Sequence, residues 1–138
     1  MIREYILLLT LLVTSTIATA GVVKVDLDVG EIQPGQTIVI HLDALMPNHT
    51  YILSCALTSN HLSGNPYDIV EINTPTNSSD IGLTAEETKP GSHQYRLPTH
   101  KNGYLYGNIS KEIGDISITN LDNTDTILLS SCHAVGRV

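Results

Sequence analysis

The sequence predicts an all-β protein, a small two-sheet β-sandwich with immunoglobulin-like architecture. Apolar residues alternate with polar residues in many short segments, and this period of two is typical of half-buried strands. Turn residues separate these segments, and no segment carries an extended helical pattern. The spacing gives about seven to nine short strands, which is typical of a sandwich; a small β-barrel is the alternative.

Four strands are expected in the first half of the domain. Val and Leu alternate with Lys and Asp over residues 23–29, and a Gln-Pro-Gly-Gln turn follows at residues 33–36. Pro sets φ in such a turn, and Gly supplies a positive φ. Further strands are expected over residues 37–42, 51–57 and 68–72.

The second half continues the same pattern. Residues 81–84 are weakly strand-like, and clearer strands are expected over residues 94–97, 103–110, 115–121 and 126–135. Loops rich in Asn, Ser, Gly and Pro lie between them.

One connection, Asn102-Gly103, is the dipeptide most typical of a tight β-hairpin. Pro98 lies at the first strand of this expected hairpin, and Pro within a sheet is confined to edges. An edge strand offers unpaired backbone groups to a partner strand. Because Arg96 and Lys101 are two of the few cations in the chain, the hairpin is the expected partner surface.

Tyr104 and Tyr106 complete this candidate surface. They lie two residues apart, so a strand places both rings on one face, with Tyr95 facing them across the hairpin. Such a pair can bind sugars or peptides, because Tyr offers apolar area and a polar tip. The alternative is packing in the core or across strands, since the chain has no Phe and no Trp. We expect packing for at least one of the two rings.

Residues 1–20 are expected to be a secretory signal peptide. A basic start at Arg3 precedes an apolar stretch, and Ala18-Thr19-Ala20 is a typical cleavage site. The apolar stretch is shorter than the roughly 20 residues that cross a membrane. The expected product, cleaved after Ala20, is one secreted or periplasmic domain of residues 21–138 with no further membrane span.

The charge of the expected mature chain excludes one class of partner. Loss of Arg3 and Glu4 leaves 6 basic and 13 acidic residues, a net charge of −7. Proteins bind nucleic acid chiefly through basic contacts to phosphates, so no nucleic-acid partner is expected. The same argument applies to an anionic membrane surface.

Cys55 and Cys132 are expected to form a disulfide, because exported proteins fold in an oxidising environment. A metal-thiolate pair and two free thiols are the alternatives. Closing a loop of this length stabilises the fold by about 4.5 kcal/mol in the chain-entropy model. The bond would join an early strand to the last one, which suggests a link between two sheets.

Two groups of side chains raise the question of a metal. His41, Met46 and His49 are close in sequence, and imidazole and thioether ligands suit copper. The six histidines are nevertheless scattered, so we expect no tightly held metal and no cofactor. Asp122 and Asp125, with Asn123 between them, could offer oxygen ligands to calcium. They lack the pattern of an EF-hand loop, and a solvated turn is expected there.

No motif indicates catalysis. The chain has no G-x-S-x-G sequence, and its cysteines are expected to bond each other. We therefore expect a non-enzymatic binding or structural module of the cell envelope or extracellular space, acting through contacts with another protein there. The alternatives are a periplasmic copper-type metal-binding protein and a small secreted hydrolase or enzyme inhibitor.

Overall fold

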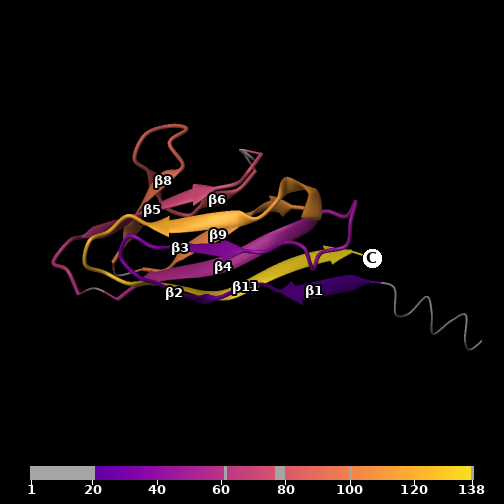
Figure 1. Ribbon diagram of the computed structural model, residues 1–138, viewed down its shortest axis with the longest axis horizontal. Helices are drawn as coiled ribbons and strands as arrows, with labels where there is room; N and C mark the ends of the chain where they lie inside the picture. The colour runs from indigo at the N-terminus through magenta and orange to yellow at the C-terminus, as the bar shows by residue number, and fades with distance from the viewer. Residues whose placement is uncertain (1–20, 61, 77–79, 100, 138) are drawn as a thin grey trace, which may run out of the picture.

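The computed structural model describes residues 21–60, 62–76, 80–99 and 101–137, and it confirms the two-sheet β-sandwich (Figure 1). The expected signal peptide of residues 1–20 lies outside the described residues, and so do His61 and His100. In the described part of the chain, no helix is long and apolar enough to cross a membrane.

Each segment that alternation marked as a strand contains one. The described residues form eleven strands and one 3-10 turn, η1 (Lys111–Ile113). The strands are β1 (Val22–Asp26), β2 (Gly30–Ile32), β3 (Thr37–Ile40), β4 (Tyr51–Ser59), β5 (Tyr67–Asn73), β6 (Gly82–Leu83), β7 (Glu86–Glu87), β8 (Gln94–Pro98), β9 (Gly103–Ile109), β10 (Ile116–Asn120) and β11 (Ile127–Arg137).

Two antiparallel sheets form the layers of the sandwich. Sheet A has the order β1-β11-β4-β9-β6, with β2 also pairing to β11, and sheet B has the order β3-β10-β5-β8-β7. If β1 and β2 count as one interrupted strand, and the two-residue strands β6 and β7 as edge additions, eight principal strands remain. When these eight are numbered along the chain, their order is 1-8-3-6 in sheet A and 2-7-4-5 in sheet B. This is the connectivity of a jelly roll rather than that of an immunoglobulin domain.

The disulfide lies within sheet A. The register of β11 against β4 shifts between Ser130 and His133, so Ser131 and Cys132 together oppose the single residue Cys55. Cys55 and Cys132 are both buried, and they form the expected disulfide across a separation of 77 residues. The expectation that this bond links the two sheets is wrong, because β4 and β11 are neighbours in one sheet.

The expected hairpin at Asn102-Gly103 is also wrong. The strands on either side of it, β8 and β9, belong to different sheets, so the connection crosses between the layers. Gly103 is required by packing: a Cβ atom there would lie 2.5 Å from Cδ1 of Leu97. The edge of sheet B is formed by β7, which pairs with β8 but ends before it reaches Pro98.

The core fills the space between the sheets with Ile, Leu and Val side chains from both layers. Two tyrosines are buried with them, Tyr51 and Tyr95. The Tyr51 hydroxyl accepts a hydrogen bond from the backbone N–H of Met46 at 3.0 Å, so its polar tip is satisfied. The remaining tyrosines of the described strands are left for the surface.

Candidate functional site

The outer face of sheet A carries an unusual amount of exposed apolar surface. The described residues include ten large hydrophobic side chains that are exposed, and five of these lie on this one face: Val22, Ile52, Tyr104, Tyr106 and Leu128. Alternation in the strands explains their position, because every second residue of a strand points away from the core. A sheet face that is not designed to meet a partner usually carries polar residues there.

Tyr104 and Tyr106 stand side by side on this face, 49% and 50% exposed. Their cross-strand neighbours in β4 are Ala56 and Ser54, which are too small to cover the rings. Neither ring packs in the core, but the expected packing against a neighbouring strand is present for Tyr106. The ring of Tyr106 extends over Gly82 of the edge strand, where a Cβ atom would lie 3.0 Å from its hydroxyl oxygen.

Tyr95 does not lie across a hairpin from these rings, since β8 belongs to sheet B. Tyr95 and Tyr106 nevertheless line the same hollow of about 320 Å³, which opens between the edge strands of the two sheets. Burial raises the pKa of the Tyr95 hydroxyl, and the nearby Glu87 and Tyr106 add to this effect. Tyr106 thus connects the outer face of sheet A with an opening between the layers.

The two expected cations are separated. Arg96 lies on the outer face of sheet B, where its guanidinium is 3.6 Å from the Glu86 carboxylate and 5.7 Å from the ring centre of Tyr67. Lys101 is exposed in the connection that leads to β9. Of the four residues of the predicted partner surface, only Tyr104 and Tyr106 share a face with each other.

Two cations that sequence reasoning missed lie at the other end of sheet A. Lys24 in β1 lies opposite Val135, and Arg137 in β11 lies opposite Val22. Arg137 also lines a hollow of about 330 Å³ together with Val22 and Ile52. The sequence does indicate that Lys24 points outward, because it alternates with the inward-facing valines of the first strand.

The outer face of sheet B is different in character. Its polar side chains bond to one another: Thr37 to Thr119 at 2.8 Å, and Glu71 to both Asn73 at 2.8 Å and Gln94 at 2.9 Å. Polar side chains that already hydrogen-bond to one another are less available for hydrogen bonds to a partner. The outer face of sheet A therefore exposes more large apolar side chains, whereas the outer face of sheet B has polar side chains that hydrogen-bond to one another.

A polar row crosses the outer face of sheet A. Asp26, His133 and Ser54 are cross-strand neighbours, and Nδ1 of His133 is 3.0 Å from the Asp26 carboxylate. These are the residue types of a hydrolytic triad. Among the described residues, however, Ser54 makes no hydrogen bond to His133, and the row lies on an open sheet surface. The geometry gives the hydrolase alternative no developed site.

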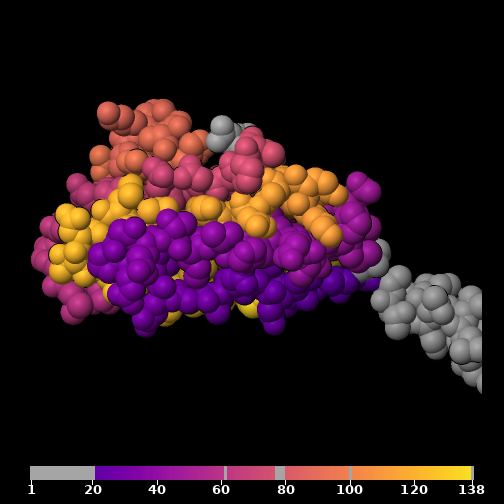
Figure 2. All heavy atoms as spheres, in the orientation of Figure 1, coloured from indigo at the N-terminus to yellow at the C-terminus, as the bar shows by residue number. Residues whose placement is uncertain are grey.

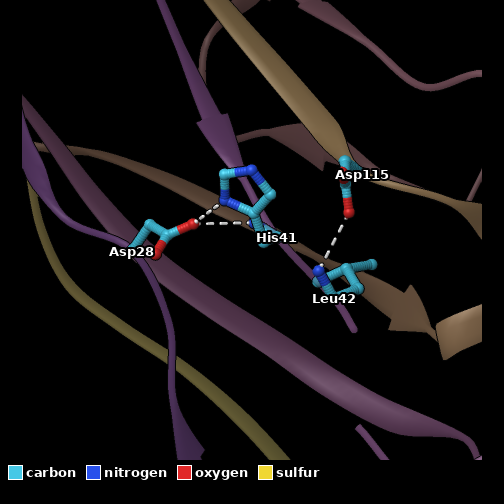
Figure 3. A network of polar contacts seen from close by, with 4 residues as sticks. All are labelled: Asp28, His41, Leu42 and Asp115. Carbon is cyan, nitrogen blue, oxygen red and sulfur yellow. Dashed lines mark hydrogen bonds and ion pairs between the residues drawn. The ribbon is translucent and has the colours of Figure 1, made fainter. Parts of the chain in front are cut away.

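The residues of the copper alternative are engaged elsewhere. Figure 3 shows the His41 ring turned to Asp28, whose carboxylate is 2.6 Å from Nδ1 and also accepts the His41 backbone N–H at 2.8 Å. Nδ1 of His49 contacts the backbone oxygen of Pro47 at 2.8 Å. Met46 is exposed. Neither histidine belongs to a group of three His, Cys, Asp or Glu ligand atoms within the described residues.

One such group does exist, and it consists of carboxylates. Ligand atoms of Asp68, Asp122 and Asp125 all lie within 4.8 Å of one another. Asp125 is completely buried, and its carboxylate accepts hydrogen bonds of 2.6 Å from both the backbone N–H and the hydroxyl of Ser63. The expectation that this turn is merely solvated is therefore wrong for Asp125.

Sequence reasoning missed Asp68, although a signal for it was present. Asp68 alternates in phase with Val70 and Ile72, so the same strand face that carries the core residues also carries a carboxylate. Asp68 is 1% exposed, and neither of its carboxylate oxygens has a hydrogen-bonding partner among the described residues.

The protonation of this cluster follows from its burial. Burial raises the pKa of the Asp68 carboxyl to about 7; the Ser59 hydroxyl opposes this shift and Asp125 reinforces it. For Asp125 burial also acts upward, but the hydrogen bonds from Ser63 outweigh it and hold the pKa below its usual value. The cluster therefore combines one carboxyl that resists ionisation with one that is held ionised.

The described geometry thus offers two features with functional potential. One is the outer face of sheet A, where Tyr104 and Tyr106 are exposed beside other apolar side chains. The other is the buried carboxylate cluster at one end of the sandwich. No family model matches the chain, and no curated protein and no solved structure is detectably similar to it.

Proposed function

We propose that the chain is an exported, non-enzymatic binding module that holds another extracytoplasmic protein against the outer face of sheet A. The observation that carries this proposal is the concentration of exposed apolar side chains, including Tyr104 and Tyr106, on that face. Exposed large apolar side chains that gather on one face of a small domain support an interaction site there. Tyrosine is also among the residue types that contribute most to protein interfaces.

The chemistry of the face indicates the chemistry of the partner. Lys24 and Arg137 lie opposite Val135 and Val22, at one end of the face, in a chain whose net charge is −7. A protein with an apolar patch and an acidic rim would complement this arrangement, since rim charges steer association and exclude like-charged partners. The serines and Ala56 between the larger side chains leave a shallow surface suited to a protein rather than to a small molecule.

The test compares two faces of the same molecule. Tyr104→Ala combined with Tyr106→Ala should reduce capture of the partner from the native extracellular or envelope fraction at least tenfold, because tyrosine anchors commonly contribute 2 kcal/mol or more, roughly 30-fold in affinity. The melting temperature should stay nearly constant, since both rings are half exposed. Capture is measured by quantitative mass spectrometry of the bound proteins.

Tyr67→Ala is the matched control. Tyr67 is also exposed, at 42%, but it lies on the outer face of sheet B beside Arg96. Its removal should leave capture unchanged. Equal capture by the double variant and the native protein would show that the outer face of sheet A is not the binding surface.

A further inference from the structure

The carboxylate cluster is built from chain segments that are distant in sequence. Asp68 projects from the start of β5, while Asp122 and Asp125 lie in the connection from β10 to β11. At this end of the sandwich the segments of residues 62–66 and 120–126 lie close together (Figures 1 and 2). The backbone N–H of Asn60 donates to the Thr126 oxygen at 3.0 Å, which fixes this approach.

The backbone around the cluster is held in place by hydrogen bonds that leave carboxylate oxygens available. Oδ2 of Asp122 accepts the backbone N–H of Thr124 at 2.8 Å and that of Asp125 at 2.5 Å. Nδ2 of the buried Asn120 donates to the backbone oxygens of Asp125 at 2.7 Å and of Ile32 at 2.9 Å. These bonds use one oxygen of Asp122 and neither oxygen of Asp68. Each oxygen of Asp125 accepts one hydrogen bond from Ser63 and keeps a second lone pair.

Three acidic side chains at this separation repel one another unless a proton or a cation lies between them. None of the ion pairs among the described residues involves them, and Asp68 has both oxygens buried without a hydrogen-bonding partner. Burying a carboxylate without a partner is costly, so an oxygen-lined space of this kind is normally completed by another group. Asp68 is aimed into the cluster and is the group that most needs completion.

We infer that Asp68, Asp122 and Asp125 form a calcium-binding site that ties the β10–β11 connection to β5. Oxygen atoms that share one calcium ion at 2.3–2.6 Å lie no more than about 5 Å apart, and the separations within the cluster meet this limit. All three donors are hard oxygen ligands, and the irregular loop origin of two of them suits the flexible coordination of calcium better than the strict octahedron of magnesium. Asp122 is partly exposed, so water can complete the coordination from its side.

The direct test is a calcium titration of the purified, disulfide-bonded protein after treatment with a chelator. At pH 8, calorimetry should give one site with a dissociation constant of about 10⁻⁴–10⁻³ M, the range of extracellular calcium modules. Calcium should raise the melting temperature, because it binds the folded state alone. Magnesium at the same concentration should raise it less, and sodium chloride at the same ionic strength should not reproduce the shift.

Variants separate calcium binding from stability. Asp68→Asn and Asp122→Asn should each weaken calcium binding at least tenfold; the second is the safer variant, because an Asn oxygen can still accept the turn hydrogen bonds. Asp43→Asn is the control, since Asp43 is exposed beyond the far end of β3. Absence of calcium heat and of any calcium-dependent melting shift would overturn the inference, as would an unchanged shift in Asp68→Asn. A cluster that holds only a proton would give these contradicting results.

Discussion

The contact between His41 and Asp28 shifts the pKa values of both side chains. The hydrogen bond to Asp28 is the main reason that the pKa of His41 is raised; burial opposes it, and the charges of Asp28, Asp115 and Asp43 add to it. The pKa of Asp28 is lowered, first by the His41 backbone N–H and then by its ring. The backbone N–H of Leu42 is held in turn by Asp115 at 3.1 Å (Figure 3).

The direction of each pKa shift defines the pH range over which that group stabilises the fold. The stabilisation from His41 is complete below the ordinary histidine pKa of about 6.5 and is lost as pH rises through the raised value. The stabilisation from Asp28 is complete above the ordinary aspartate pKa of about 3.9 and is lost as pH falls through the lowered value. The pair therefore stabilises the fold most between these two ordinary values.

Asp28→Asn should remove this contribution. We expect the pKa of His41, measured by NMR titration of its ring proton, to fall towards the ordinary histidine value, because the largest of the influences that raise it is removed. The difference in unfolding free energy between native protein and variant should be largest between about pH 4 and pH 6.5. Asp43→Asn, which removes a weaker influence, should lower the His41 pKa less. A His41 pKa that is the same in Asp28→Asn and in the native protein would contradict the described pair.

Among the elements of the fold, β11 combines the most constraints. It is eleven residues long, pairs with β4 on one side and with β1 and β2 on the other, and contains the bulge that carries Cys132. The interruption between β1 and β2 lies beside this bulge, where the Leu27 backbone N–H donates to the Cys132 oxygen at 2.9 Å. The disulfide to Cys55 therefore fixes the register of two neighbouring strands at an irregular point.

Cys132→Ser together with Cys55→Ser should lower the free energy of unfolding by about 2–5 kcal/mol, because the unfolded chain regains the freedom of a long loop. Urea denaturation of the native and variant proteins at equal concentration measures this difference. Reduction of the native protein before denaturation should give a loss of similar size. A loss below about 1 kcal/mol would show that sheet pairing alone fixes this part of the fold.

Strand positions could be predicted from the sequence, but strand partners could not. The alternation of Tyr51, Leu53 and Cys55 is a local pattern, and it follows directly from the pleat of a strand. The assignment of β8 and β9 to different sheets depends instead on their pairing with strands distant in sequence: β8 pairs with β5, and β9 pairs with β4. For the same reason a dipeptide that usually makes a hairpin serves here as a crossing between layers.

The candidate sites, like the strands, could be predicted from the sequence only in part. The spacing of Tyr104 and Tyr106 was sufficient to predict that they share a face, but which face required the phase of β9 against the core. Asp122 and Asp125 were visible as an acidic turn, whereas their meeting with Asp68 depends on contact between segments more than fifty residues apart. Local patterns therefore identified members of each site, and tertiary contacts decided how those members combine.

At the scale of the whole molecule, the sandwich presents two unlike faces from one compact core. The outer face of sheet B carries polar side chains that bond one another and the exposed Tyr67, while the outer face of sheet A exposes five large apolar side chains. The disulfide lies beneath the second face and stiffens the strands that display it. A rigid face of this kind requires little reordering on association, which lowers the entropic cost of binding.

Site-specific photo-crosslinking can determine whether the outer face of sheet A meets the partner. A photoreactive phenylalanine derivative replaces Tyr104 in one protein and Tyr67 in another, each in the native host. We expect a crosslinked adduct with one partner protein from position 104 and none from position 67. Crosslinking to that partner from position 67 with none from position 104 would contradict it.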